Sequence, residues 1–173
     1  MMSTRRSFML KAAPVAVLGA VLLPVSPAVS ARTVELDEAG LLEAAKRIDS
    51  IPDSALKSDE AYERWKKENL AIAPRGGIGC GLAITTGLAS TAFVAAKVFK
   101  IKAAIKAAGG AKKFVDLLIT GFKVAKAEGK SNAAALEFAA QEAAQSGGKE
   151  VAVAILDLIS LKDVLSECFG VEL

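Results

Sequence analysis

Alanine supplies much of the apolar character of this chain, and this choice of residue constrains the fold most. The chain is 53% hydrophobic but only 5% aromatic. Alanine has the highest helix propensity and lets helix backbones approach closely, whereas strands alternate β-branched and aromatic residues with polar ones. Such alternation is hard to find here. We therefore predict an all-α fold: a single compact helical bundle with a Gly/Ala-rich central helix, preceded by two short acidic helices.

Glycine, proline and capping residues set the expected helix ends. Ser58 and either Ser131 or Asn132 are placed as N-caps, and the Gly109-Gly110 and Gly147-Gly148 pairs each separate two helices. A break of the last helix at Ser160 is left open. The predicted helices span residues 37–48, 59–71, 76–108, 111–127, 132–145 and 149–168.

Residues 76–96 carry no charge and contain a line of small side chains at helical spacing. Such a line lets two helices pack at close range, in a membrane or in a protein core. The length would permit a membrane span, but the segment is only mildly apolar, so a buried helix of a soluble bundle is favoured. The predicted helix-packing residues are Gly77, Gly81, Ala83, Gly87, Thr91 and Ala95.

Charge is distributed in blocks along the chain. Residues 32–69 carry seven Lys or Arg and ten Asp or Glu, residues 70–130 carry ten and two, and residues 131–173 carry two and seven. A basic amphipathic middle is typical of helices that bind anionic membrane surfaces. Its alternative is a solvated face that pairs with the acidic flanks. The candidates for membrane contact are Lys97, Lys100, Lys102, Lys106, Lys112, Lys113, Phe114 and Phe122.

The absence of histidine from the whole sequence argues against most enzyme chemistry. It removes the usual general base, the Ser-His and Cys-His nucleophile pairs and the commonest metal ligand. We predict no enzymatic activity, no catalytic or metal-binding residues and no cofactor. Nucleic acid is not an expected partner either, because the phenylalanines of the basic segment have core spacing and arginine is almost absent there.

The two cysteines, Cys80 and Cys168, are separated by 88 positions and share no metal-ligand spacing. In an oxidising compartment two cysteines are typical of one disulfide. Two buried free thiols are the alternative. A bridge that closes so long a loop would stabilise the fold by about 4–5 kcal/mol.

The first 31 residues have the parts of an export signal. Residues 4–11 read Thr4-Arg5-Arg6-Ser7-Phe8-Met9-Leu10-Lys11, and an apolar run over residues 12–23 follows. That run is too short to cross a bilayer, which takes about 20 residues. Small residues allow cleavage after Ser30 or Ala31. We predict that residues 1–31 are a signal peptide and that the mature protein is secreted, hence extracellular.

The residues around Arg5 and Arg6 resemble the twin-arginine export signal, whose pattern is Ser/Thr-Arg-Arg-x-Phe-Leu-Lys. Met9 takes the place of the leucine, and the lysine comes one residue late, at Lys11. The resemblance implies a chain that folds before export, which suits a helical protein with local contacts. An ordinary secretory signal is the alternative.

Two functions follow for the exported protein. In composition, residues 76–127 are similar to helical pore-forming bacteriocins, which implies an antimicrobial protein whose partner is an anionic membrane. The acidic helical region 32–74 would then be a pro-segment that masks the helical core domain 75–173. The alternative is a helical interaction or inhibitor module whose partner is an envelope protein; the oligomeric state is left open. Lysines that pair with acidic residues of neighbouring helices would favour the alternative.

Overall fold

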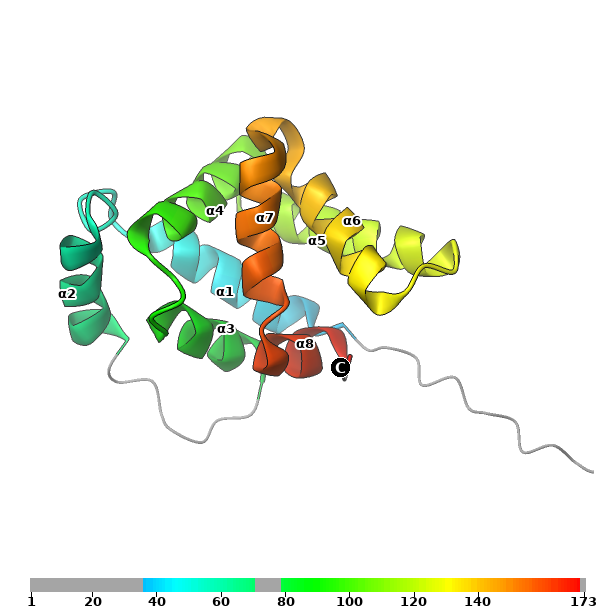
Figure 1. Cartoon of the computed structure of the whole chain (residues 1–173), viewed down its shortest axis with the longest axis horizontal. Coiled ribbons are helices and arrows are strands. Elements are labelled where there is room, and N and C mark those ends of the chain that lie inside the picture. The colour runs from blue at the N-terminus through cyan, green and yellow to red at the C-terminus, as the bar shows by residue number, and fades with distance from the viewer. Residues whose placement is uncertain (1–35, 71–78, 172–173) are drawn as a thin grey trace, which may run out of the picture. The chain divides into compact units, whose positions relative to one another are not determined.

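The computed structural model describes residues 36–70 and 79–171. The predicted signal peptide, its cleavage sites and Gly77 lie outside these residues. Throughout the described ranges the chain forms helices and connecting turns, with no strand (Figure 1). The all-α prediction is confirmed. The helices are α1 Glu38–Ser50, α2 Asp59–Asn69, α3 Cys80–Ala89, α4 Ala95–Ala107, α5 Ala111–Ala127, α6 Asn132–Ala144, α7 Gly148–Ile159 and α8 Lys162–Phe169, with a 3-10 turn, η1, at Gln145–Gly147.

Three helices begin at side-chain caps that the sequence makes available. Asp37, Ser58 and Ser131 each accept a hydrogen bond from the backbone N–H three residues later, at Gly40, Ala61 and Ala134. These bonds satisfy donors that the first turn of a helix leaves free. The cap at Ser58 was predicted, Ser131 is one of the two candidates left open for α6, and α5 has the bounds expected for it.

The prediction of one helix over residues 76–108 is wrong, because the helix is interrupted between the end of α3 at Ala89 and the start of α4 at Ala95. Ser90 is extended, with φ −69° and ψ 158°. Its backbone N–H and its hydroxyl both donate to the carbonyl of Gly87, at 3.1 and 2.6 Å, and so close the end of α3. The start of α4 is capped from a distant element, since Asp59 Oδ1 accepts the N–H of Ala95 at 2.9 Å.

The last predicted helix divides at Ser160, the position left open. Its hydroxyl donates to the carbonyl of Leu156 at 2.6 Å, and the chain turns there between α7 and α8. The turn lets α8 pack against α3 while α7 packs against α4 and α6.

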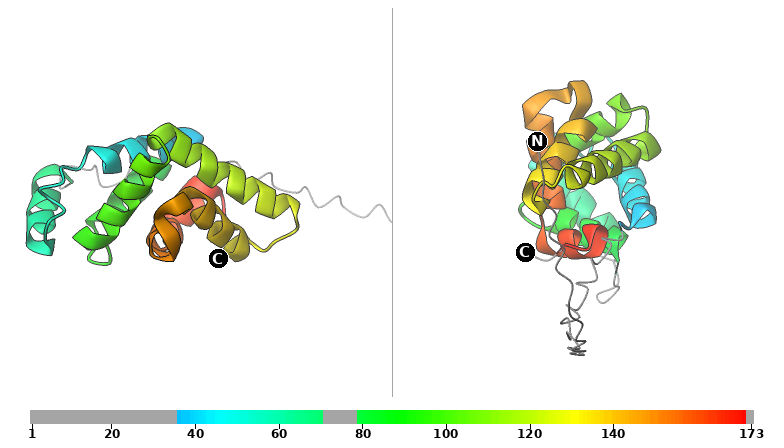
Figure 2. Two further views of the ribbon diagram at one scale, coloured as in Figure 1. Left: turned by 90° about the horizontal axis from the view of Figure 1, so that it is seen from above. Right: turned by 90° about the vertical axis from the view of Figure 1, so that its right-hand side faces the viewer.

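Helices α5 and α6 lie side by side in Figures 1 and 2 and have the most extensive contact of any helix pair among the described residues. Ala135, Ala139 and Ala143 of α6 are completely buried. Opposite them, a Cβ atom added at Gly121 would lie 3.0 Å from the Cα of Ala139. Small side chains thus permit the backbones of α5 and α6 to approach closely. The sequence had indicated such packing only for the small-residue line between Gly77 and Ala95.

Helix α1 belongs to the core although it lies in the acidic N-terminal region. Leu41, Ala44, Ala45 and Ile48 are buried, and α1 packs against α3, α4 and α5. Helix α2 instead covers the corner between α3 and α4, where the hydroxyl of Tyr62 donates to the carbonyl of Leu88 at 3.2 Å. The removal of residues 32–74 as a pro-segment stays a prediction. Such a cleavage would remove the buried side chains of α1 from the core.

Candidate interaction face

The lysines of α4 that face α7 are paired with carboxylates. Lys97 Nζ lies 2.7 Å from Asp157 Oδ2, and Lys100 Nζ lies 2.7 Å from Glu150 Oε2. The hydrogen bond and the charge of Lys100 lower the pKa of Glu150 below its ordinary value. The two pairs form a charged seam between α4 and α7, with the basic side chains on α4 and the acidic ones on α7.

On its other flank, α4 holds the connection between α1 and α2. Lys102 is buried, and its ammonium donates to the carbonyl of Ile51 and to Asp53 Oδ1, the latter at 2.5 Å. Lys106 Nζ lies 3.8 Å from the same carboxylate oxygen. The hydrogen bond from Lys102, followed by the charges of both lysines, lowers the pKa of Asp53. All four lysines of α4 therefore have carboxylate partners on other elements.

The membrane-contact candidates of the sequence analysis have different locations in the fold. Lys102, Phe114 and Phe122 are buried, so they would reach a membrane only if the bundle opened. Lys97 and Lys100 are partly exposed and belong to the seam. The remaining candidates, Lys106, Lys112 and Lys113, are exposed.

The small-residue line does not extend along one helix. Ala83 and Gly87 are buried on α3, and a Cβ at Gly87 would meet Leu161 and Leu158. Gly81 is half-buried beside Glu43, Thr91 is exposed in the turn after α3, and Ala95 is buried at the start of α4.

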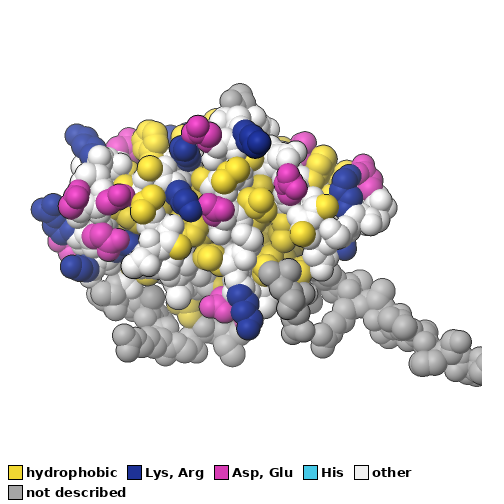
Figure 3. Space-filling view, in the orientation of Figure 1, with side chains coloured by type: hydrophobic (Ala, Val, Ile, Leu, Met, Phe, Trp, Pro, Cys, Tyr) yellow, Lys and Arg dark blue, Asp and Glu magenta, His cyan; other side chains and the backbone are white. Residues whose placement is uncertain are grey.

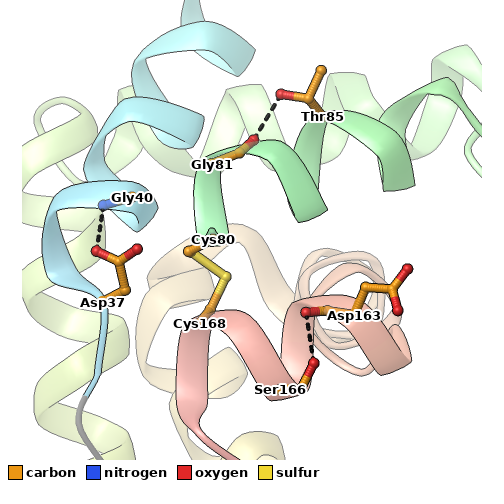
Figure 4. The surroundings of a disulfide bond; sticks show 8 residues. All are labelled: Asp37, Gly40, Cys80, Gly81, Thr85, Asp163, Ser166 and Cys168. Carbon is orange, nitrogen blue, oxygen red and sulfur yellow. Dashed lines mark hydrogen bonds between the residues drawn. A yellow bond between two sulfur atoms is a disulfide. The ribbon is translucent and has the colours of Figure 1, made fainter. Parts of the chain in front are cut away.

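Cys80 and Cys168 form a disulfide, as predicted. Both residues are completely buried, and the bridge joins the first residue of α3 to the last turn of α8 (Figure 4). The start of α1 packs against it: the N–H of Asp37 donates to the carbonyl of Cys168 at 3.1 Å. A Cβ at Gly40 would lie only 2.7 Å from the Cβ of Cys80.

The surface of α4 and α7 carries apolar side chains on both sides of the charged seam, as Figure 3 shows for this face. Phe99 on α4 is 52% exposed and Val153 on α7 is 46% exposed, and Ala96 and Ala103 are exposed one turn before and after Phe99. We call these residues, with the seam between them, the α4–α7 face. A groove of about 440 Å³ between α6 and α7 adjoins it and is lined by Val153, Leu156, Ala152, Gln141 and Lys149.

Sequence reasoning missed this face, although its signal was present. Val94, Val98, Ile101 and Ile105 recur at helical spacing and so predict the buried stripe of α4. The last three are buried, and Val94 is 38% exposed. Positions 96, 99 and 103 lie opposite that stripe at helical spacing, where an exposed helix normally carries polar residues. Their apolar character was the available clue.

Among the described residues, no helix is both long and apolar enough to cross a bilayer. The same residues contain no group of three or more His, Cys, Asp or Glu side chains placed to hold a metal ion.

No family model matches the chain, and no curated protein or solved structure matches it either.

Proposed function

We propose that this protein is an exported, non-enzymatic helical interaction module. It binds another protein while its own helical bundle stays folded. One observation carries the proposal: every lysine of α4 pairs with a carboxylate of another element, namely Asp53, Glu150 or Asp157. The positive charge of α4, at the centre of the basic middle, is thus largely neutralised within the fold.

Membrane binding by this region would require the fold to open. A basic amphipathic helix binds lipid through free cationic groups and an accessible apolar face. Here the large apolar side chains of α5, Phe114 and Phe122, are in the core. Releasing the ammonium of Lys102 would break bonds to Asp53 and to the carbonyl of Ile51. The disulfide additionally holds α3 to α8.

Export is supported by the signal-like residues 1–31 and by the bridge between Cys80 and Cys168. Structural disulfides persist in oxidising compartments and are rare in the cytosol. We place the working protein outside the cytosol for these two reasons.

The binding surface that we assign to the module is the α4–α7 face. Exposed aromatic side chains surrounded by smaller apolar ones are typical of protein-binding sites, and Phe99 is such a side chain. The charged seam would orient the partner, because charge pairs contribute to specificity and association rate more than to affinity.

Dye release from vesicles of anionic lipid tests the choice between protein binding and membrane activity. We expect no release by the oxidised, folded protein. A double variant, Glu150→Gln with Asp157→Asn, frees Lys97 and Lys100 and should also release none, because the core phenylalanines stay buried. Release by the folded parent protein would contradict the proposal.

A photo-reactive amino acid placed at position 99 tests for the protein partner in cells that produce the chain. We expect a discrete crosslinked product that contains a second protein chain. The matched control is the same substitution at Val124, which is exposed near the C-terminal end of α5. Equal crosslinking at both positions would count against a defined binding face.

Bacteriocin-like membrane activity is the second candidate function. It is favoured by the exposure of Phe99 on the same helix as Lys100 and Lys106, both of which remain partly accessible. The vesicle experiment above decides it.

A further inference from the structure

We propose that the partner of the α4–α7 face is a second copy of this chain, related by a two-fold axis that runs along the charged seam. The inference rests on the proposed function and names its partner. Most soluble oligomers are symmetric dimers, and their interfaces must be complementary to themselves.

The apolar side chains of the face lie on both sides of the seam. Phe99 and Val153 are the most exposed large apolar side chains of the described residues. One belongs to α4 and the other to α7. A two-fold axis along the seam places α4 of each copy over α7 of the other. The apolar flank of one helix then covers the apolar flank of the other, which removes both from water.

The charges of the face select a copy of itself. Lys97 and Lys100 form its basic edge, and Glu150 and Asp157 form its acidic edge. The same axis brings the basic edge of each copy opposite the acidic edge of the other. Because the two edges balance, the face offers no net charge to a membrane, whereas a second copy matches it charge for charge.

Each carboxylate of the seam also keeps an oxygen available. Among the described residues, Glu150 pairs through Oε2 and Asp157 through Oδ2. The Glu150 side chain is 81% exposed. The other oxygen of each carboxylate can therefore accept from a lysine of the second copy, and the internal pairs need not break. The ion pairs would become four-membered clusters across the interface.

Sedimentation equilibrium of the oxidised mature protein tests the inference, over concentrations from about 1 µM to about 1 mM. We expect the mass to rise from one chain to two. Phe99→Glu places a charge on one apolar flank of the face and should raise the dissociation constant at least about tenfold. Val124→Glu is the matched control, since it makes the same kind of change at an exposed position of α5, and this variant should dimerise like the parent. At about 1 µM, where the parent is expected to be a monomer, both variants should have the parent melting temperature.

A second variant protects the test against an unforeseen folding defect. Val153→Glu changes the other flank of the face and should weaken association as Phe99→Glu does. A protein that stays monomeric over the whole range, or a control that weakens association as much as the face variants, would overturn the inference. A monomer that crosslinks a different protein through position 99 would overturn it too, but would leave the proposed function standing. Dye release from vesicles would instead overturn the proposed function.

Discussion

The disulfide end of the bundle, where α1, α3 and α8 meet, and the α5–α6 pair are stabilised by different means. Helix α3 has ten uncharged residues and no side-chain cap, and α8 has eight residues. Helices this short are marginal on their own, and a covalent bridge joins them. Helices α5 and α6 have 17 and 13 residues and are joined by alanine packing against Gly121. Length and close packing thus replace a crosslink.

Removal of the disulfide should lower the stability of the fold more than any other change proposed here, and it should do so through the disulfide end. The double variant Cys80→Ala with Cys168→Ala should lose about 4–5 kcal/mol of unfolding free energy, because the unfolded chain regains the freedom of a long open loop. Urea unfolding of the oxidised proteins measures the difference. The reduced parent should match the variant, and equal stability of the two oxidised proteins would contradict the prediction.

The α5–α6 pair should be most sensitive at Gly121. Gly121→Ala places a Cβ 3.0 Å from the Cα of Ala139, and backbone cannot yield as a flexible side chain does. We expect a loss of about 1–3 kcal/mol through overpacking, measured by urea unfolding. Thr120→Ala, at the exposed neighbouring position, is the control and should change stability by less than about 0.5 kcal/mol. Similar values for both variants would show that α5 and α6 do not need the glycine.

The same substitution at the disulfide end should cost less. The Cβ of Gly87→Ala would meet the tip of Leu161 at 2.5 Å, and that side chain can rotate away. The helix propensity of alanine, better by about 0.5–1 kcal/mol, offsets part of the strain. We expect a net loss below about 1 kcal/mol. A larger loss than at Gly121 would reverse the ranking of the two regions.

Acid should weaken the contact between Lys102 and the turn that joins α1 to α2 before it affects the α5–α6 pair. The pKa of Asp53 is lowered from 3.8 in the folded protein. Its contribution to stability is therefore complete above that value and is lost as the pH falls through the lower, folded pKa. As the pH is lowered from above 3.8 through the folded pKa of Asp53, the melting temperature of the parent should fall more steeply than that of Asp53→Asn. Parallel curves would contradict the prediction.

Most helices of this fold could be predicted because their signals are local. Alanine content, the caps at Ser58 and Ser131 and the glycine pairs depend on neighbouring residues only. The disulfide was predictable because the chain has two cysteines and an export-like start. The break after α3 was not, because it depends in part on Asp59, which caps α4 from 36 positions away.

The candidate site was less predictable than the fold. The charge blocks indicated that lysines would either pair or remain free, but the partners of Lys97 and Lys100 come from α7, about 50 to 60 residues along the chain. Helix periodicity alone cannot say which element will cover a given flank. It was the observed arrangement of α4 beside α7 that showed Phe99 and Val153 to be left uncovered.

The position of the bridge also affects the order of events during biosynthesis. Cys80 has its partner only once α8 exists, because Cys168 belongs to that helix. A ribosome-bound chain that stops short of α8 therefore cannot lock α3 in place, however oxidising its surroundings. Crosslinking is coupled to the completion of the helical set, and fragments that lack α8 keep a free thiol at Cys80 by which they can be told from finished molecules.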